Sequence, residues 1–458
     1  MKKIFTIFLL VLLISVSVRL PAAAQDEIII TDLGTLGGPS SNAFAINNLN
    51  QVAGWADTAS GSFHAFLWQD GLMTDLGTLG GPQSFVEAIN NLGQVVGWAN
   101  TASGSVHAFL WQDGVMTDLG TLGSPSSYAT AVNNLGQVVG SSYLATPNQH
   151  GFLWQDGVMT DLGTLGHKHS HAFDINDIGQ VVGKSENATN VDERAFLWQD
   201  GVMIDLGTLG GPTSVAYKIN DLGQVIGQSD TSTGAYHAFL WQDGVMTDLG
   251  TLGGSRSYVR AINNLGQVVG YSMTASDEWH AFLWLDGAMV DLGTLGGNYS
   301  FAFDINDLGQ VIGQSYTTAT GAFHAVLWQD GVMTDLGTLG GLASEAYAVN
   351  DLGQVVGWSY TTTWQFHATL WTVPNIIIEQ VSELVEAGTL NEGQGNSLIS
   401  QIENVLAKLE NGNTEAACNQ LQAFINHVQS FVDDGVLTSG EGELLIDPAQ
   451  RVRSQVCP

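Results

Sequence analysis

The sequence predicts an all-β eight-bladed β-propeller with four-stranded blades, followed by a small all-α helical bundle. The first observation is a repeat, because the phrase DLGTLG begins at residues 32, 75, 118, 161, 205, 248, 291 and 335. Its spacing of 43 or 44 residues is typical of a propeller blade or of an α-solenoid unit. No unit contains a helix-length stretch with a 3.6-residue apolar period, which argues against the solenoid.

The second observation is that each unit reads as two hairpins. The run HAFLW (107–111) meets VMTDLG (115–120) across Gln-Asp-Gly, and AYAVN (346–350) meets QVVGWS (354–359) across NDLG. Asn or Asp followed closely by Gly supplies the positive φ angles that hairpin turns need. Two hairpins make four short strands, and the large side chains of HAFLW are expected to pack between neighbouring blades.

The third observation concerns the ends of the repeat region. EIIITDLG (27–34) is only the last strand of a unit, and HATLW (367–371) is only the third. We expect the first strand to join the last three in a 3+1 closure of the ring, which would hide exposed sheet edges. The predicted boundaries are a signal peptide at 1–24, an eight-repeat propeller at 27–373 and a C-terminal helical module at 374–458.

The N-terminal 25 residues and the charge predict an exported protein. MKKIFTIFLLVLLISVSVRLPAAAQ has two lysines, an apolar run and small residues before the expected cleavage near Ala24. The mature chain would keep 9 basic against 44 acidic residues, a net charge of −35. We therefore expect a secreted, extracellular or periplasmic protein without a nucleic-acid partner and without membrane insertion after signal cleavage.

The repeated phrases HAFLW, DLGTLGG and INNLGQVVG resemble the bacterial HAF extracellular repeat family over residues 27–373. The resemblance implies secretion and a repeat architecture, and it brings no catalytic residues. Arg194 replaces the His of HAF in one unit, and Asn50 replaces a turn Gly in another. Such tolerated exceptions favour a packing role for the phrase.

The last 85 residues have a helical pattern, with two apolar stripes. Thr414 and Gly435 are the predicted start and end of the second of these helices. The phrase AFINHV resembles the FIMAH module of bacterial secreted proteins, which implies an accessory module. Cys418 and Cys457, the two cysteines of the chain, suggest a disulfide in an exported protein, the alternative being two free thiols. The stripes are Leu398, Ile402, Val405 and Leu409, and then Leu421, Phe424, Ile425, Val428 and Phe431.

Two sets of polar side chains are candidates for chemistry. The His of HAF and the Asp of DLG recur in nearly every unit, so we interpret them as a hydrogen-bond network and as turn-fixing acceptors. The stretch HKHSH differs, because His167, His169 and His171 would share one face of a strand and could bind zinc or copper. The alternative is plain divergence of a loop, since no fourth ligand is evident.

Variation between the units is concentrated on one face of the predicted disc. The hairpin turns hardly change, whereas the connections between second and third strands and between blades do. Partner contacts of repeat proteins often lie on such a face. Aromatic residues there are candidate ligand-binding residues, unless they tuck under the loops as local core. They are Phe63, Trp98, Tyr143, Tyr236, Trp279, Trp358, Trp364 and Phe366.

These observations predict a secreted, non-catalytic protein that binds an extracellular glycan or protein through its variable face, with no cofactor. No GxSxG, HExxH or phosphate-binding P-loop motif occurs, so we expect no enzymatic activity. Two alternatives remain. One is a polysaccharide hydrolase or lyase that uses acids such as Glu87 or Glu345 in the central funnel. The other is a structural component of the cell envelope or matrix.

Overall fold

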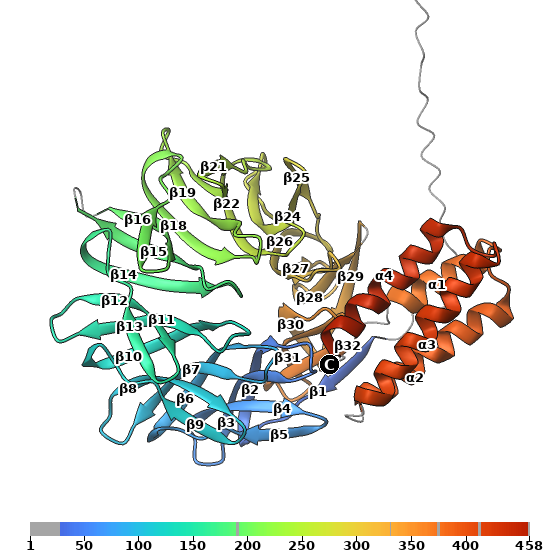
Figure 1. The fold of residues 1–458 in the computed structure, drawn as a ribbon, viewed down its shortest axis with the longest axis horizontal. Coiled ribbons are helices and arrows are strands. Elements are labelled where there is room, and N and C mark those ends of the chain that lie inside the picture. Colours follow the sequence, from blue (N-terminus) through green and yellow to red (C-terminus); the bar gives the residue numbers. More distant parts are fainter. Residues whose placement is uncertain (1–27, 189–191, 330, 373–375, 411–413, 457–458) are drawn as a thin grey trace, which may run out of the picture.

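The computed structural model describes residues 28–456 except 189–191, 330, 373–375 and 411–413. Strands run from Ile29 to Thr372, and helices run from Ile376 to Val456 (Figure 1). The chain is therefore mostly β, with several sheets in a propeller-like arrangement and a small helical region at its C-terminal end. The predicted signal peptide at 1–24 lies outside the described residues.

The strands follow one pattern, in which a long strand is followed by two medium strands and a short one, each antiparallel to its predecessor. The long first strands are β2 (Gly37–Ile46), β6 (Gly80–Ile89), β10 (Gly123–Val132), β14 (Gly166–Ile175), β18 (Gly210–Ile219), β22 (Gly253–Ile262), β26 (Gly296–Ile305) and β30 (Gly340–Val349). The second strands are β3 (Val52–Thr58), β7 (Val95–Thr101), β11 (Val138–Leu144), β15 (Val181–Asn187), β19 (Val225–Thr231), β23 (Val268–Thr274), β27 (Val311–Thr317) and β31 (Gln354–Thr361). The third strands are β4 (Phe63–Gln69), β8 (Val106–Gln112), β12 (Gln149–Gln155), β16 (Glu193–Gln199), β20 (Tyr236–Gln242), β24 (Trp279–Leu285), β28 (Ala322–Gln329) and β32 (Phe366–Thr372). The short fourth strands are β5 (Leu72–Asp75), β9 (Val115–Asp118), β13 (Val158–Asp161), β17 (Val202–Asp205), β21 (Val245–Asp248), β25 (Ala288–Asp291) and β29 (Val332–Gly337).

The repeated glycines have two different structural causes. In the Gln-Asp-Gly turns, both central residues have positive φ, as in Asp70 (52°) and Gly71 (82°), which matches the twist of a two-residue hairpin. Gly54 in the second strand has ordinary φ, but a Cβ there would lie 2.0 Å from the carbonyl oxygen of Asn42. The first and second strands therefore approach too closely for any side chain at this position.

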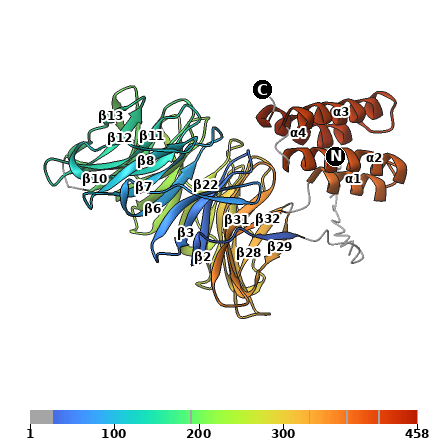
Figure 2. The ribbon, with the colours of Figure 1, turned by 90° about the horizontal axis from the view of Figure 1, so that it is seen from below.

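Strand β1 (Ile29–Asp32) pairs with β32 in a sheet of order β1-β32-β31-β30. Ile30 lies opposite Trp371 in the register, and the N–H of Leu33 donates to the carbonyl of Ala368 at 2.9 Å. The first and last strands of the β region thus lie side by side in one sheet (Figures 1 and 2).

The core of the β region lies between neighbouring units. Phe109, for example, is fully buried in a cluster with Ala65, Leu67 and Leu76 of the preceding unit and Val95 of its own. Equivalent clusters recur around the molecule, because no unit can bury its own face alone. The fully buried phenylalanines of the third strands are Phe66, Phe109, Phe152, Phe196, Phe239 and Phe282.

The helical region has its own core and consists of two helical hairpins. Its helices are α1 (Ile376–Glu386), α2 (Glu392–Glu410), α3 (Thr414–Asp433) and α4 (Ser439–Val456). Most residues of the two predicted apolar stripes lie in this core. Gly435, which has a φ of 72°, follows the end of α3. The side chain of Leu409 lies outside the described residues. Among the described residues, no helix combines the length and apolar character that crossing a membrane requires.

Candidate functional site

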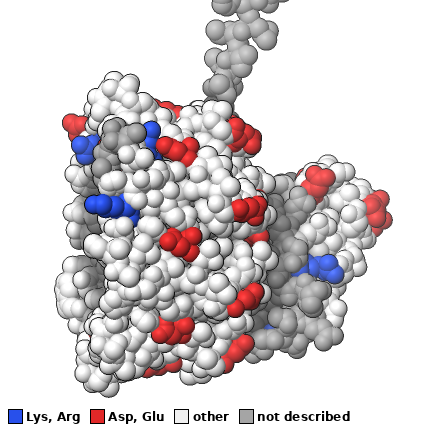
Figure 3. Space-filling view, turned by 60° about the vertical axis from the view of Figure 1, so that its left-hand side comes forward, with Lys and Arg blue, Asp and Glu red and all other residues white. Residues whose placement is uncertain are grey.

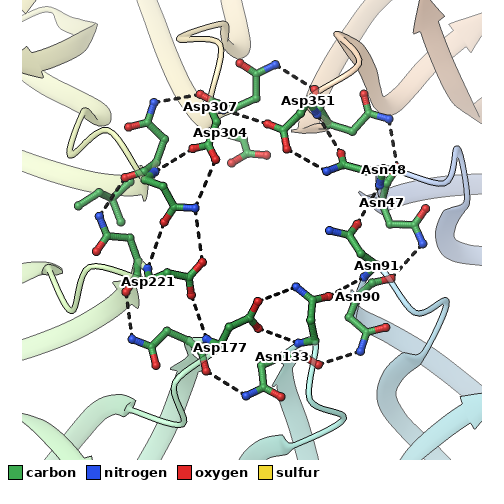
Figure 4. Close-up of a pocket in the computed structure, with 18 of the residues that line it drawn as sticks. Asn47, Asn48, Asn90, Asn91, Asn133, Asp177, Asp221, Asp304, Asp307 and Asp351 are labelled. Atoms are coloured by element: carbon green, nitrogen blue, oxygen red, sulfur yellow. Dashed lines mark hydrogen bonds between the residues drawn. The ribbon is translucent and has the colours of Figure 1, made fainter. Parts of the chain in front are cut away.

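The Asn-[Asn/Asp] turns after the first strands meet around a central opening (Figure 4). The first Asn of each turn is buried, and its Nδ2 donates to the backbone carbonyl of the equivalent Asn in the next unit at 2.8–3.1 Å. The last of these bonds runs from Asn350 to Asn47, at 3.1 Å. The members are Asn47, Asn90, Asn133, Asn176, Asn220, Asn263, Asn306 and Asn350.

A second circle of hydrogen bonds lies beside the first. Each backbone N–H at the next position donates to the side-chain Oδ1 of its equivalent in the following unit at 2.8–3.1 Å, and Asp351 returns to Asn48. The two circles line a cavity of about 350 Å³. Because their amides and carboxylates bond mainly to one another, we interpret them as structural. The members are Asn48, Asn91, Asn134, Asp177, Asp221, Asn264, Asp307 and Asp351.

Two carboxylates lie deeper in the same cavity. Asp174 accepts the N–H of Ile219 in the next unit, and Asp304 likewise accepts the N–H of Val349, both at 3.0 Å. Burial raises the pKa of both carboxyls, that of Asp304 to about 6. The Nζ of Lys218 lies 3.7 Å from Asp174 and opposes the rise for both.

Further along the lumen, the first strands contribute a belt of side chains that we call the lumen girdle. Neighbouring first strands contact each other around the centre (Figure 1), so equivalent residues meet. Phe44 and Tyr347 stack at 5.5 Å between ring centroids, and the guanidinium of Arg260 lies 5.6 Å from the ring centre of Phe303. The girdle consists of Phe44, Glu87, Thr130, Phe173, Tyr217, Arg260, Phe303 and Tyr347.

The acids named from the sequence as funnel candidates both lie at this level. Burial raises the pKa of Glu87 to about 7, although its side chain remains accessible from the lumen and Lys218 opposes the rise. Burial also raises the pKa of Glu345. Two hydrogen bonds oppose this rise, one from the hydroxyl of Tyr347 at 3.0 Å and one from the Nε1 of Trp358 at 3.2 Å. Glu345 is held by protein donors, whereas Glu87 faces the lumen.

Four of the eight predicted aromatic residues come together at the variable end. Phe63, Trp98, Trp358 and Phe366 belong to a continuous series of half-buried rings whose successive centroids are 5.7–6.2 Å apart. Sequence reasoning missed two members, Trp55 and Phe85, although Trp55 holds the same position in its second strand as the predicted Trp98. We call this series the first aromatic arc, and its order is Trp358, Phe366, Trp55, Phe63, Trp98 and Phe85.

The other predicted aromatic residues are distributed differently. Tyr236 and Trp279 lie 5.7 and 5.5 Å from Tyr258, at one end of a second arc that continues through Tyr271, Phe301 and Phe323. Tyr143 and Trp364 are 37% and 66% exposed, and Trp364 contacts Tyr360 at 6.3 Å. The predicted aromatic face therefore divides into two arcs, with Trp364 joined to the first arc through Tyr360 and Tyr143 belonging to neither.

The repeated His and Asp form pairs within each unit, as the network interpretation predicted. His64 Nδ1 lies 2.9 Å from Asp75, whose Oδ1 also accepts the N–H of Gly77. Where Arg194 replaces His, its Nε still lies 3.4 Å from the equivalent Asp205. The remaining pairs are His107–Asp118, His150–Asp161, His237–Asp248, His280–Asp291, His324–Asp335 and His367–Asp32.

The predicted metal site at HKHSH is not formed. Within the described ranges, no three His, Cys, Asp or Glu side chains are arranged to hold a metal ion. Instead, His167 bonds to Glu186 at 2.6 Å, His169 accepts the N–H of Gln149 at 3.1 Å, and His171 stacks on Phe173. The strand is irregular between Gly166 and Ser170, so the alternation on which the prediction depended is interrupted.

Cys418 in α3 is disulfide-bonded. Its predicted partner, Cys457, lies outside the described residues, so their pairing stays a prediction.

Comparisons with known proteins identify the helical region and relate the β region to known folds. The FIMAH domain family model matches residues 375–454, which confirms the resemblance of AFINHV to that module. No curated protein matches the chain in sequence.

Similar solved structures include a puromycin-hydrolyzing peptidase of Mycobacterium tuberculosis, with 12% identity, 72% of this chain and 58% of that chain covered, and a TM-score of 0.41. Dipeptidyl peptidase 4 of Porphyromonas gingivalis has 9% identity, 74% and 58% coverage, and a TM-score of 0.49. TolB of Acinetobacter baumannii has 10% identity, 62% and 64% coverage, and a TM-score of 0.34. The chain thus spans 58% of the length of each of the two peptidases.

These structures correct one prediction. The absence of catalytic motifs led us to expect a protein without enzymatic activity, but the similar structures include peptidases, so that expectation is not retained. At this low identity the likeness concerns the fold alone, and it assigns no catalytic residue to the chain.

Proposed function

We propose that the chain is an exported HAF-type repeat protein whose strands form an eight-bladed propeller with 3+1 closure. Three contacts between the ends of the β region support this proposal. Strand β1 pairs with β32, His367 bonds to Asp32 at 2.8 Å, and both hydrogen-bond circles return from the last unit to the first. The second and third of these contacts involve repeated residues, so the junction uses the same chemistry as the other units.

We further propose that the variable end binds a glycan, and the first aromatic arc is the observation that carries this proposal. Aromatic rings stack on the apolar faces of sugar rings, and half-buried rings offer such faces without a large loss of side-chain entropy. The adjoining loops are rich in hydroxyls, such as the bonded pair Thr58 and Ser60 at 2.8 Å and the pair Thr101 and Ser103 at 2.9 Å. Apolar faces beside hydroxyl groups match a neutral carbohydrate better than a charged partner.

A glycan array followed by calorimetry with the best fragment tests this proposal. We expect Trp98→Ala and Trp55→Ala each to weaken binding about tenfold, which corresponds to about 1.4 kcal/mol. Val115→Ala at the opposite end, where the side chain is exposed, is the matched control and should leave affinity unchanged. An array without any bound glycan, or affinity unchanged in both tryptophan variants, would contradict the proposal, and capture of a protein ligand would favour a protein partner.

A second candidate function, polysaccharide hydrolysis, is favoured by Glu87. A carboxyl with a pKa of about 7 inside a lumen is partly protonated at neutral pH, as a general acid must be. Products from any polysaccharide that disappear with Glu87→Gln but persist with Glu278→Gln would support it. Glu278 is the control because it lies in a loop beside β24 and bonds to Ser276. Turnover that survives Glu87→Gln would exclude Glu87 from this role.

A further inference from the structure

We infer that grooves between neighbouring units at the turn end bind a cationic peptide segment with aliphatic side chains. This end carries the Asn-[Asn/Asp] and Gln-Asp-Gly turns, so the site is separate from the aromatic arcs. One such groove lies between the first two units and has a volume of about 530 Å³. Leu72 and Leu92 line it together with Trp111, and the exposed residues Asp70 and Asp113 line it as well.

The aliphatic residues of the groove are more exposed than their role in the fold requires. Leu72 and Leu92 are 68% and 54% exposed, while Trp111 beneath them is buried. The turns need Asp, Asn and Gly for their φ angles, but nothing in their geometry requires Leu or Val at these positions. Exposed apolar residues that adjoin one another, rather than lie scattered singly, mark binding surfaces, and Leu72 and Leu92 line one groove. Equivalent residues that are 58–64% exposed are Val115, Leu135, Val158, Ile178, Val202, Leu222, Val245, Leu265 and Val332.

The charge of this end specifies a cationic occupant. The six Lys and Arg of the β region all lie between residues 168 and 260 and belong to strands, so the described turns of this end contain none. Asp recurs in the Gln-Asp-Gly turns, and Figure 3 shows carboxylates scattered over the surface, whereas the basic side chains of the β region gather in one part of the face drawn. A Lys or Arg beside an aliphatic residue therefore complements both the carboxylates and the groove.

The repeat also places the grooves in series. Asp70 of the first unit and Asp113 of the second unit both line the first groove. Because Asp113 is the equivalent of Asp70 in the repeat, it should also line the groove between the second and third units. One extended segment that reaches two grooves would gain affinity through effective concentration rather than through new contacts. The sixth unit departs from the pattern, because Leu285 replaces Gln and Val290 replaces Thr. The fourth unit likewise has Ile204 in place of Thr, so we place the test in the three grooves between the first four units.

Fluorescence anisotropy with the whole chain and two labelled peptides tests this inference at 0.15 M salt. One peptide alternates lysine with leucine, and the other alternates lysine with serine. We expect the lysine–leucine peptide to bind at least tenfold more tightly. The triple variants Leu92→Ser/Leu135→Ser/Ile178→Ser and Asp70→Asn/Asp113→Asn/Asp156→Asn should each remove most of that advantage. Asn tolerates the positive φ of these Asp positions, and all six side chains are exposed, so both variants should keep the wild-type melting temperature.

Two controls separate this site from the net charge and from the variable end. Asp57→Asn removes one charge at the variable end and should leave both peptides unaffected, and the leucine variant should not change binding of the lysine–serine peptide. Equal affinity for the two peptides, or lysine–leucine binding unchanged in the leucine variant, would overturn the inference. Failure of both peptides to bind would do the same, and a glycan that still binds would show that the proposed function stands independently.

Discussion

The two ends of the β region use the same repeat for opposite purposes. At the turn end, nearly every unit supplies the same Asn, Asp and Gly, and these residues bond from one unit to the next in closed circles. At the variable end, equivalent positions hold Trp55, Trp98, Ser141, Lys184 and Gln228 in successive units. The common residues at one end hold the units together, whereas the differing residues at the other end produce a surface that is not repeated from unit to unit.

The largest effect should come from comparing two tryptophans of the last unit. Trp371 is fully buried between units, and Trp364 is 66% exposed at the variable end. We expect Trp371→Ala to lower the free energy of unfolding by about 3–5 kcal/mol, because it leaves a cavity in the core. Trp364→Ala should change it by less than about 0.5 kcal/mol. Urea denaturation of both variants checks this, and equal losses would show that burial does not distinguish the two positions.

A smaller effect should come from the first hydrogen-bond circle. Asn306 donates to the carbonyl of Asn350 and to Gln310, and it accepts the N–H groups of Leu308 and Gln310. Asn306→Ala leaves buried polar groups unpaired, so we expect a loss of about 1–3 kcal/mol in the free energy of unfolding. Ser103→Ala in an exposed loop of the other end serves as the control and should be nearly neutral in the same denaturation experiment. Wild-type stability of Asn306→Ala would mean that the circle does not hold the units.

A pH-dependent effect should come from His324, which lies in β28 and pairs with Asp335. The hydrogen bond with Asp335 raises the pKa of His324 against the effect of burial. A raised folded pKa gives stability that is fully present below the ordinary value near 6.5 and is lost as pH rises through the raised value. The pKa of Asp335 is lowered, so this carboxylate stays charged over that range. His324→Gln should therefore lower the melting temperature more at pH 5.5 than at pH 8.5, and equal decreases would contradict this.

The smallest effect should come from restoring the common residue in the fourth unit. Arg194 and Asp205 form a partly exposed ion pair in place of the usual His–Asp pair. Such pairs contribute little, so Arg194→His should change the free energy of unfolding by less than about 1 kcal/mol. A larger loss in denaturation would show that Arg194 has a specific role in its unit.

The sequence predicted the features that depend on period and turn chemistry. It located the hairpins, the His–Asp pairs and the buried stripes of the helices, because each recurs at fixed spacing or follows a known local rule. It also placed Phe63 and Phe366 at the variable end. It did not show that Trp55 contacts Phe366, since that contact joins the first unit of the β region to the last.

The errors and omissions have physical causes as well. Strict strand alternation gave the metal prediction at HKHSH, and the irregular register of β14 removes it. The pKa of Glu87 depends on how much protein surrounds the lumen, which no local pattern encodes. The exposure of Leu92 could not be predicted from the sequence either. A Leu in a repeated phrase resembles a core residue, and its exposed fraction depends on how the neighbouring units pack.

The position of the N-terminal strand is the central claim of this account, and hydrogen–deuterium exchange measures it most directly. Strand β1 should behave as part of the last unit, since it pairs with β32 over four residues. We predict that a peptide covering Ile29–Leu33 exchanges as slowly as one covering Phe366–Trp371. Exchange of Ile29–Leu33 within seconds, beside a protected Phe366–Trp371, would show that the ring is open.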